Sequence, residues 1–343
     1  MIKFHPWNIG IQLVKQREGW KIPVIACQRK QDFAAPATNC CSLIESLHQM
    51  NAPEAADSAD SGRSVFQQHS RLFESNRFVY PVVSRRSQGV SVGVNLNPDK
   101  VCNFDCIYCQ VNRRSESDTR FVDMQPLLEE LQSVLQLVNS GELFQHPQFA
   151  STPEHLRRLN DIAFSGDGEP TTFRNFDQII AAAAEIRRQH VSDTVRMVLI
   201  TNASMFHRPH VKRGLEILDQ NNGQIWAKLD AGTENYYQLI ERTKIPFRQI
   251  LDNITAAAIV RPIVIQSLFM NVNGVPPDAA EIFAFCNRLQ ECSAAGGQLE
   301  LVQIYTVARQ PAESFVTALS KSEVEDIAST VREVTGLQAV AYV

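Results

Sequence analysis

The sequence predicts an α/β protein built from parallel strand–helix–strand units. From residue 80 onward, short runs rich in β-branched residues alternate with longer helical runs, which is typical of parallel βαβ units. Polar residues gather where the apolar strand runs stop, and parallel α/β proteins build their sites at that end. The 343 residues are 44% hydrophobic and 20% charged, enough for one large domain with a full core.

The first part of the chain follows a different pattern. Residues 51–64 are rich in Ala, Asp and Ser and carry no sustained apolar period, so residues 1–70 are expected to form an irregular extension that is partly disordered or a linker. We expect the core to span residues 71–310. Residues 311–343 are expected to form a short appendage, with a helix at Lys321–Thr335 and a β-prone tail at Leu337–Val343.

Six strands and five intervening helices are expected in the core. The strands are expected at Gly89–Asn95, Asp161–Gly166, Arg196–Thr201, Gln224–Asp230, Pro262–Met270 and Glu300–Thr306. The helices are expected at Pro126–Val138, Phe176–His190, Arg208–Leu218, Phe247–Val260 and Asp278–Cys292.

Charge, hydropathy and cysteine content limit the function classes. The formal net charge of −4 argues against dominant nonspecific binding to nucleic acid. No apolar run reaches the length of a membrane span, and residues 1–10 have no long apolar segment of the secretory type. We therefore expect a cytoplasmic protein with no membrane association. Eight cysteines in a reducing compartment point to metal or redox chemistry.

Three of the cysteines form one short motif directly after the first predicted core strand. Cys102, Cys106 and Cys109 have the spacing C-x₃-C-x₂-C. A [4Fe–4S] cluster normally takes four protein thiolates, so three on one loop leave one iron open to an outside molecule. A zinc site needs a fourth ligand, and the nearest histidines, His69 and His146, are distant in sequence. Zinc binding, or an iron–sulfur protein that only transfers electrons, remains an alternative at this stage.

A glycine-rich turn after the second predicted strand is the other chemical signal. Residues 166–170 read Gly-Asp-Gly-Glu-Pro. The glycines let the backbone approach a ligand closely, and Glu169 offers a carboxylate that could pair with an amino group. The alternative is a tight turn with Glu169 near a helix N-terminus. Thr201, Asn202 and Asp230 lie at the ends of later strands, so all these groups are expected to face one mouth.

The cysteine triplet with an aromatic residue before its last cysteine, followed by the Gly-Asp-Gly-Glu-Pro turn, resembles the radical S-adenosylmethionine (radical SAM) superfamily. The resemblance covers residues 88–306, and Asp167 stands where the family motif has its first glycine. It implies a partial (β/α)₆ TIM-like barrel. Residues 80–86 and 95–100 resemble an uncharacterised branch that is similar to wyosine-synthase-like and molybdenum-cofactor-synthase-like proteins.

The resemblance implies an enzyme whose cofactors are a [4Fe–4S] cluster and S-adenosylmethionine. Cleavage of the latter gives a 5′-deoxyadenosyl radical that abstracts hydrogen from a substrate, such as a nucleoside, a tRNA base or a small metabolite. Flavodoxin or ferredoxin is the implied reducing partner. The implied cluster ligands are the three cysteines of the triplet, and the implied S-adenosylmethionine contacts are Tyr108, Gly166, Asp167, Gly168, Glu169, Thr201 and Asn202.

Substrate-side residues are less determined by the sequence. Lys228 and Asp230 share one face of a strand with Trp226 by the two-residue period, so Lys228 is a candidate substrate contact or Schiff-base amine. The competing interpretation, which the sequence favours, is a lysine paired with Asp230. Arg309 is a candidate for holding an anionic group. The pairs Arg85-Arg86 and Arg113-Arg114 could contact phosphate on RNA or a nucleotide, but two-residue basic pairs are usually solvated surface, which is the expectation here.

Overall fold

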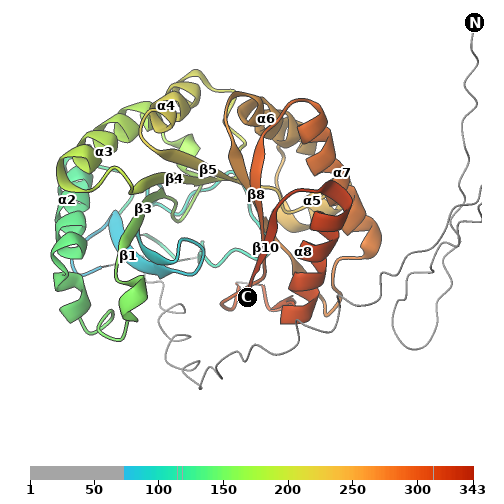
Figure 1. Cartoon of the computed structure of the whole chain (residues 1–343), viewed down its shortest axis with the longest axis horizontal. Coiled ribbons are helices and arrows are strands. Elements are labelled where there is room, and N and C mark those ends of the chain that lie inside the picture. Colours follow the sequence, from blue (N-terminus) through green and yellow to red (C-terminus); the bar gives the residue numbers. More distant parts are fainter. Residues whose placement is uncertain (1–72, 114, 118, 312) are drawn as a thin grey trace, which may run out of the picture. The chain divides into compact units, whose positions relative to one another are not determined.

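The computed structural model describes residues 73–343 except residues 114, 118 and 312. The extension predicted for residues 1–70 lies outside these residues. Eight strands of the described part form one curled sheet in the order β1-β2-β3-β4-β5-β6-β8-β10. Figure 1 shows the sheet on the inside with helices along its outer side, and β1 and β10 as its two edges. The predicted partial barrel is therefore confirmed.

The sheet alternates with helices along the chain. The strands of the sheet are β1 (Val79–Ser84), β2 (Gly89–Val94), β3 (Leu159–Phe164), β4 (Arg196–Thr201), β5 (Gly223–Lys228), β6 (Ile263–Leu268), β8 (Leu299–Tyr305) and β10 (Ala339–Tyr342). The helices are α2 (Met124–Ser140), α3 (Phe176–His190), α4 (Pro209–Asp219), α5 (Glu234–Glu241), α6 (Phe247–Val260), α7 (Ala279–Ala294) and α8 (Lys321–Thr335).

Strand direction places the site residues together. All neighbours from β2 to β10 pair in parallel, and only β1 pairs antiparallel, with β2. The carboxyl ends of the parallel strands therefore meet at one end of the barrel, which carries the loops most suited to chemistry. The turn between β1 and β2 lies at the opposite end. Strands β2 and β6 are buried at every position, as expected for strands covered on both faces.

The outer core lies between the sheet and the helices. Helix α2 buries Leu127, Leu131 and Leu135 at intervals of four residues, which puts them on one face of the helix. A smaller apolar cluster forms on the other face of the sheet from Ala163, Val198, Trp226 and Val264. This second cluster belongs to the lumen, because Ala163 and Trp226 also line the central cavity.

The expectation for one strand is wrong. The strand expected over 262–270 is broken, because β6 ends at Leu268 and β7 (Met270–Val272) pairs instead with β9 (Val316–Ala318). Between them Phe269 is fully buried against the ring of Phe285, and its N–H still donates to the carbonyl of Tyr305 at 2.9 Å. Asn271 consequently leaves the strand ends and donates to the carbonyl of Ala318 at 2.9 Å.

The C-terminal helix and tail join the same sheet. Helix α8 begins with a capping box formed by Ser320 and Glu323, a reciprocal arrangement that satisfies two backbone donors. β10 then pairs in parallel with β8, with Tyr342 opposite Tyr305. The division of the chain at residue 310 stays a prediction.

Candidate active site

A cavity of about 360 Å³ lies inside the barrel and brings the sequence-predicted residues together. Twelve of the thirteen line it: Cys102, Cys106, Cys109, Tyr108, Gly166, Gly168, Glu169, Thr201, Asn202, Lys228, Asp230 and Arg309. The remaining residue, Asp167, turns its carboxylate toward Asn95, whose Nδ2 donates to it at 2.7 Å.

The cysteine loop is held in place mainly by helix α5. The backbone N–H groups of Asp105 and Ile107 donate to the carbonyls of Glu241 and Ile240 at 3.1 and 2.9 Å. The apolar side chains of the loop pack inward, with Phe104 and Ile107 buried. These bonds use carbonyls that the end of a helix leaves without intrahelical partners. The end of α5 therefore serves as the platform for the loop.

Each of the three thiols has a different polar environment. The Cys106 Sγ donates to the Glu241 carboxylate at 2.7 Å, and burial followed by the Glu241 charge raises the pKa of Cys106 well above its ordinary value. Burial also raises the pKa of Cys102 to about 11. The guanidinium of Arg113 lies 3.5 Å from the Cys109 Sγ and donates to it.

The two glycines of the turn are required by close packing against the loop after β2. A Cβ on Gly168 would lie 2.2 Å from the carbonyl oxygen of Val101, and one on Gly166 would lie 2.2 Å from the Asn95 side-chain oxygen. No real Cβ approaches that closely, so only glycine fits without displacement. The turn and the cysteine loop therefore depend on each other for their positions.

Arg113, which also lines the cavity, joins the same two segments. Its Nη1 donates to the backbone carbonyl of Asp167 at 2.9 Å and also to that of Lys100. The expectation that Arg113 is a solvated surface residue is therefore wrong, because its guanidinium fork satisfies carbonyls on both the cysteine loop and the glycine turn. Arg114 lies outside the described residues.

Glu169 is a buried carboxylate with several donors. Its Oε1 accepts from the Thr201 hydroxyl at 2.6 Å and from the backbone and hydroxyl of Thr171, while its Oε2 accepts from the backbone N–H of Asn202 at 2.7 Å. Burial raises the pKa of Glu169, and these hydrogen bonds oppose that shift. Its bond to Thr171 caps the short turn Pro170–Thr172, so the capping role considered from the sequence is present.

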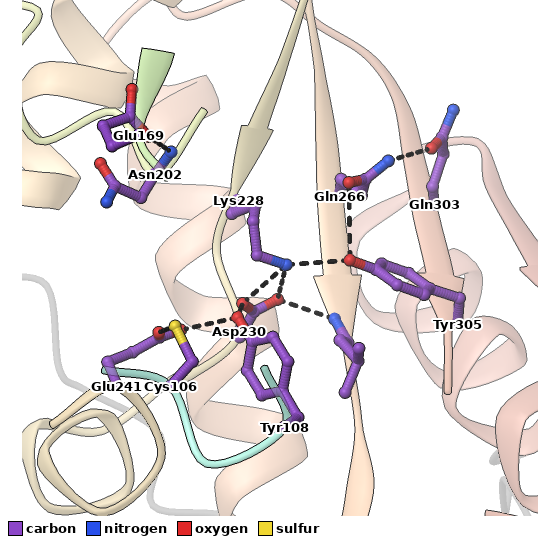
Figure 2. Close-up of polar contacts among 11 residues, drawn as sticks. Cys106, Tyr108, Glu169, Asn202, Lys228, Asp230, Glu241, Gln266, Gln303 and Tyr305 are labelled. Carbon is purple, nitrogen blue, oxygen red and sulfur yellow. Dashed lines mark hydrogen bonds and ion pairs between the residues drawn. The ribbon is translucent and has the colours of Figure 1, made fainter. Parts of the chain in front are cut away.

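Lys228 and Asp230 form an ion pair at the centre of the lumen, shown in Figure 2. Lys228 Nζ lies 3.0 Å from Asp230 Oδ2 and donates to the Tyr305 hydroxyl at 2.9 Å. Asp230 also accepts from the Tyr108 hydroxyl and from the backbone N–H of Leu268. The network continues beyond Tyr305 to two buried amides, since Gln266 donates to Gln303 at 3.0 Å.

The ion pair determines the charge of Lys228. Burial lowers its pKa, but the charges of Asp230, Tyr305 and Glu241 together with the Tyr305 hydrogen bond more than offset burial, and the pKa ends above its ordinary value. Lys228 is therefore an ammonium group at neutral pH. A Schiff-base amine must instead be neutral to attack a carbonyl, so the geometry favours the pairing with Asp230.

The remaining arginines of interest also face the cavity. The backbone carbonyl of Arg309 accepts from Gln110 at 3.3 Å. Arg85 and Arg86 line the cavity from the β1–β2 turn, and Arg86 lies over the rings of Trp226 and Tyr305. The expectation that this pair is solvated surface is wrong for Arg86, because its guanidinium covers aromatic rings inside the lumen.

The histidine considered as a zinc ligand lies elsewhere. His146 packs against the rings of Phe73 and Phe149, with centroids 5.4 and 6.1 Å away. His69 lies outside the described residues. Within the described part of the chain, no group of three or more His, Cys, Asp or Glu side chains is placed to hold a single metal ion.

Comparison with known proteins decides the family. The model of the radical SAM superfamily matches residues 96–286, more than half of the chain. This chain belongs to the radical SAM superfamily. Members of the superfamily are enzymes that use a [4Fe–4S] cluster and S-adenosylmethionine, so the predicted enzyme class and cofactors are confirmed.

Relatives among curated proteins are distant. A protein of Brachyspira hyodysenteriae named GTPase Obg is 23% identical over 260 residues, covering 74% of this chain and 33% of that protein. UPF0026 proteins of Helicobacter pylori and Methanocaldococcus jannaschii are 26% and 27% identical, covering 40% and 47% of this chain and 39% and 43% of theirs. This radical SAM chain thus spans 33–43% of the length of these relatives.

Solved structures of similar fold are also distant. TYW1 with a lysine–pyruvate adduct bound superposes with a TM-score of 0.45 at 14% identity, covering 79% of this chain and 80% of TYW1. SuiB of Streptococcus suis bound to S-adenosylmethionine gives a TM-score of 0.48 at 10% identity, covering 76% and 49%. Among the described residues of the radical SAM chain, no helix has the length and apolar character needed to cross a membrane.

Sequence reasoning missed the residues that support the site from outside the motifs. Glu241 was missed because α5 was not predicted between Asp230 and Phe247, although Thr233 caps it as an N-cap threonine should. Gln266 lies in the middle of an apolar strand run, where its polarity was the available signal. Both residues now lie on the wall of the radical SAM cavity.

Proposed function

We propose that Cys102, Cys106 and Cys109 hold the [4Fe–4S] cluster and that the turn at 166–169 binds S-adenosylmethionine beside it. The observation that carries this proposal is the shared cavity, with Gly168 packed directly against the cysteine loop. Three soft thiol donors on one loop suit an iron–sulfur cluster with one open iron. The glycine turn and the Glu169 carboxylate suit a ligand that carries an amino group, so the donor set fits both cofactors.

When bound, the cluster and S-adenosylmethionine supply the radical that removes a hydrogen atom from the substrate. The chain contributes binding and orientation. Glu169 Oε2 accepts one hydrogen bond, from Asn202, and has lone pairs left for an ammonium group. Thr201 fixes the other oxygen and so sets the direction of the carboxylate. Tyr108, which projects from the cysteine loop into the lumen, is proposed to lie beside the adenine.

The lumen network is proposed to position the substrate. Lys228 presents an ammonium group whose position is fixed by Asp230 and Tyr305, so it can donate a hydrogen bond or a charge contact with little reorganisation. Burial of Gln266 and Tyr108 keeps water from this part of the cavity. Arg309 is proposed to hold an anionic group at the rim.

A substrate and an electron donor complete the reaction. We propose a nucleoside, a tRNA base or a small metabolite as substrate, and flavodoxin or ferredoxin as the reducing partner. Both proposals follow from the chemistry of the superfamily, which requires a reductant and a substrate.

Anaerobic reconstitution tests the cofactor proposal. The wild-type protein should turn brown, bind about four irons per chain and, once reduced, cleave S-adenosylmethionine to 5′-deoxyadenosine. Cys106→Ala should lose the cluster and the cleavage, whereas Cys286→Ala, which changes a buried cysteine of α7, should keep both. A folded wild-type protein that takes up zinc and no iron under these conditions would contradict the proposal and favour a zinc-binding module.

The other alternative is an iron–sulfur protein that only transfers electrons. Such a protein would form the cluster but would not cleave S-adenosylmethionine. Glu169→Gln separates the two, because loss of the carboxylate charge should weaken S-adenosylmethionine binding while the iron content stays at the wild-type level. Equal binding of S-adenosylmethionine to Glu169→Gln and wild type would remove Glu169 from the proposal.

A further inference from the structure

Two adjacent arginines reach the cavity from the end of the barrel opposite the cysteine loop. Arg85 and Arg86 lie in the turn between β1 and β2, at the amino-terminal end of the parallel strands. Arg86 extends across the lumen, with its guanidinium carbon 5.7 Å from the ring centroid of Trp226 on β5 and 5.1 Å from that of Tyr305 on β8. Both arginines line the same cavity as the three cysteines.

The two positive charges of Arg85 and Arg86 have few negative charges near them. Among the described residues, neither arginine has a carboxylate within 4.0 Å of its guanidinium nitrogens, since the ion pairs of the described chain involve other residues. The buried Asp161 carboxylate interacts electrostatically with Arg86 and also accepts from Ser91, so one carboxylate faces the two positive charges. Burial, and then the charge of Arg86, lowers the pKa of Arg85. Two half-buried guanidinium groups beside each other are unfavourable without an anion.

The arginine pair continues the polar network described above. Lys228 Nζ lies 5.3 Å from the Tyr305 ring centroid, close to the distance of the Arg86 guanidinium from the same ring. A molecule in the lumen beside Tyr305 would therefore meet Lys228 on the side of the cysteine loop and the arginine pair on the other side. Asp230 matches the Lys228 charge, whereas the two charges of Arg85 and Arg86 face the one Asp161 carboxylate.

We propose that Arg85 and Arg86 form an anion-binding subsite for the substrate, which is a small organic molecule with a carboxylate or phosphate group. The inference rests on the proposed function, in that the molecule bound there is the substrate of the same cavity. Guanidinium groups bind planar carboxylates and phosphate oxygens through paired N–H donors. Trp226 and Tyr305 would hold the uncharged part of the molecule, while its anionic end lies at the β1–β2 turn.

The size of the site favours a small molecule over a macromolecule. The whole cavity has a volume of about 360 Å³, at the lower end of the range of about 300–1,000 Å³ typical of small-molecule sites, and the proposed cofactors would take part of that space. The Arg86 guanidinium lies beside the rings of Trp226 on β5 and Tyr305 on β8 inside the cavity, so the group that it binds must enter the lumen. Arg85 and Arg86 consequently select a substrate that carries a negative charge at one end.

Arginine labelling of the reconstituted full-length holoprotein tests the subsite. Phenylglyoxal would be applied in the absence of S-adenosylmethionine at one ionic strength, with chloride, acetate or inorganic phosphate as the anion, and each labelled arginine would be identified by peptide mass spectrometry. Acetate or phosphate should slow the labelling of Arg85 and Arg86 by about fivefold or more relative to chloride. Arg213, which is exposed and paired with Asp177, serves as the matched control and should change little.

The anion that protects identifies the chemistry. Protection by phosphate alone assigns a phosphoryl group, protection by acetate alone assigns a carboxylate, and protection by both assigns an anionic end that either group supplies. Equal labelling of Arg85 and Arg86 in all three anions would overturn the proposal. Equal slowing at Arg213 would also overturn it, since the anion would then act on arginines in general.

Variants provide an independent measurement. Arg86→Gln should weaken binding of the protecting anion by about tenfold or more in calorimetric titration, and Arg213→Gln should bind it as the wild type does. A folded Arg86→Gln protein with wild-type anion affinity would reject the subsite. Iron content and S-adenosylmethionine cleavage are measured separately on the same wild-type preparation. If the holoprotein cleaves S-adenosylmethionine but the anions do not protect Arg85 and Arg86, this proposal alone is wrong. If the anions protect the arginines but no cluster forms, the proposed function is wrong.

Discussion

Lys228 and Asp230 form a buried ion pair in the lumen, with Nζ and Oδ2 3.0 Å apart and an Asp230 side chain that is 0% exposed. The same carboxylate accepts hydrogen bonds from Tyr108 and from the backbone of Leu268. The Asp230 side chain, two residues after β5, thus joins the cysteine loop, the end of β6 and the Lys228 ammonium group. We expect the pair to affect both the stability of the barrel and the charge presented to the substrate.

Asp230→Asn should destabilise the protein. The substitution keeps the shape but leaves the Lys228 ammonium in the lumen without its charge partner, and breaking a buried pair costs about 3–5 kcal/mol. Lys228→Met should also destabilise, whereas the double variant should lose less than the two single losses combined. Urea unfolding of the four proteins measures this coupling. The exposed pair of Arg213 and Asp177 should show a coupling of about 1 kcal/mol or less in the same cycle, and equal couplings would contradict the account.

Lys228 should react slowly with amine reagents. Its pKa is raised because Asp230, Tyr305 and Glu241 together more than offset burial, so little neutral amine exists at pH 8. Reductive methylation followed by peptide mass spectrometry should label the exposed Lys212 much faster than Lys228. In Asp230→Asn, Lys228 should become more reactive because the carboxylate no longer favours the ammonium form. Fast labelling of Lys228 in the wild type would instead support a Schiff-base role.

The main features of the barrel and the site could be predicted because they depend on local patterns. The cysteine spacing and the glycine turn each lie within a few residues, and the direction of parallel strands brings them to one end of the sheet. Thr201 and Asp230 could be assigned to the same mouth for that reason. The strand that was broken at Phe269 was predicted as continuous because its apolar run does not reveal where the chain leaves the sheet.

Residues whose roles depend on tertiary packing were missed or misjudged. Arg86 follows β1, which was not predicted, so nothing in the sequence indicated that its side chain would enter the lumen. Arg113 satisfies carbonyls on a turn 54 residues away, and a pair of basic residues in sequence looks the same whether it is solvated or buried. Glu241 ends an eight-residue helix, and short helices carry too few turns for a clear period.

The carboxyls of Asp161 and Glu185 should affect stability with opposite dependence on pH. Burial raises the pKa of Asp161 in the folded protein, so its contribution is present at low pH and falls as pH rises through that pKa. Hydrogen bonding to Arg188 lowers the pKa of Glu185, so its contribution is present at neutral pH and falls as pH drops. Unfolding in urea between pH 4 and 7 should show Asp161→Asn losing less stability than the wild type as pH rises. Glu185→Gln should lose less than the wild type as pH falls, and slopes of the same sign for both variants would contradict these assignments.

Gly168→Ala should displace the cysteine loop and lower iron uptake. The added Cβ would lie 2.2 Å from the Val101 carbonyl oxygen, and relieving that contact moves either the turn or the residue that precedes Cys102. Gly141 offers a matched control, since it has a positive φ of 81° with nothing within 4 Å of an added Cβ. Gly141→Ala should therefore cost about 1 kcal/mol of stability through backbone strain alone. Iron per chain after anaerobic reconstitution, measured with the unfolding midpoint, should fall in Gly168→Ala and stay at the wild-type value in Gly141→Ala. If both variants lose stability equally and retain all their iron, the glycine turn does not position the cysteine loop.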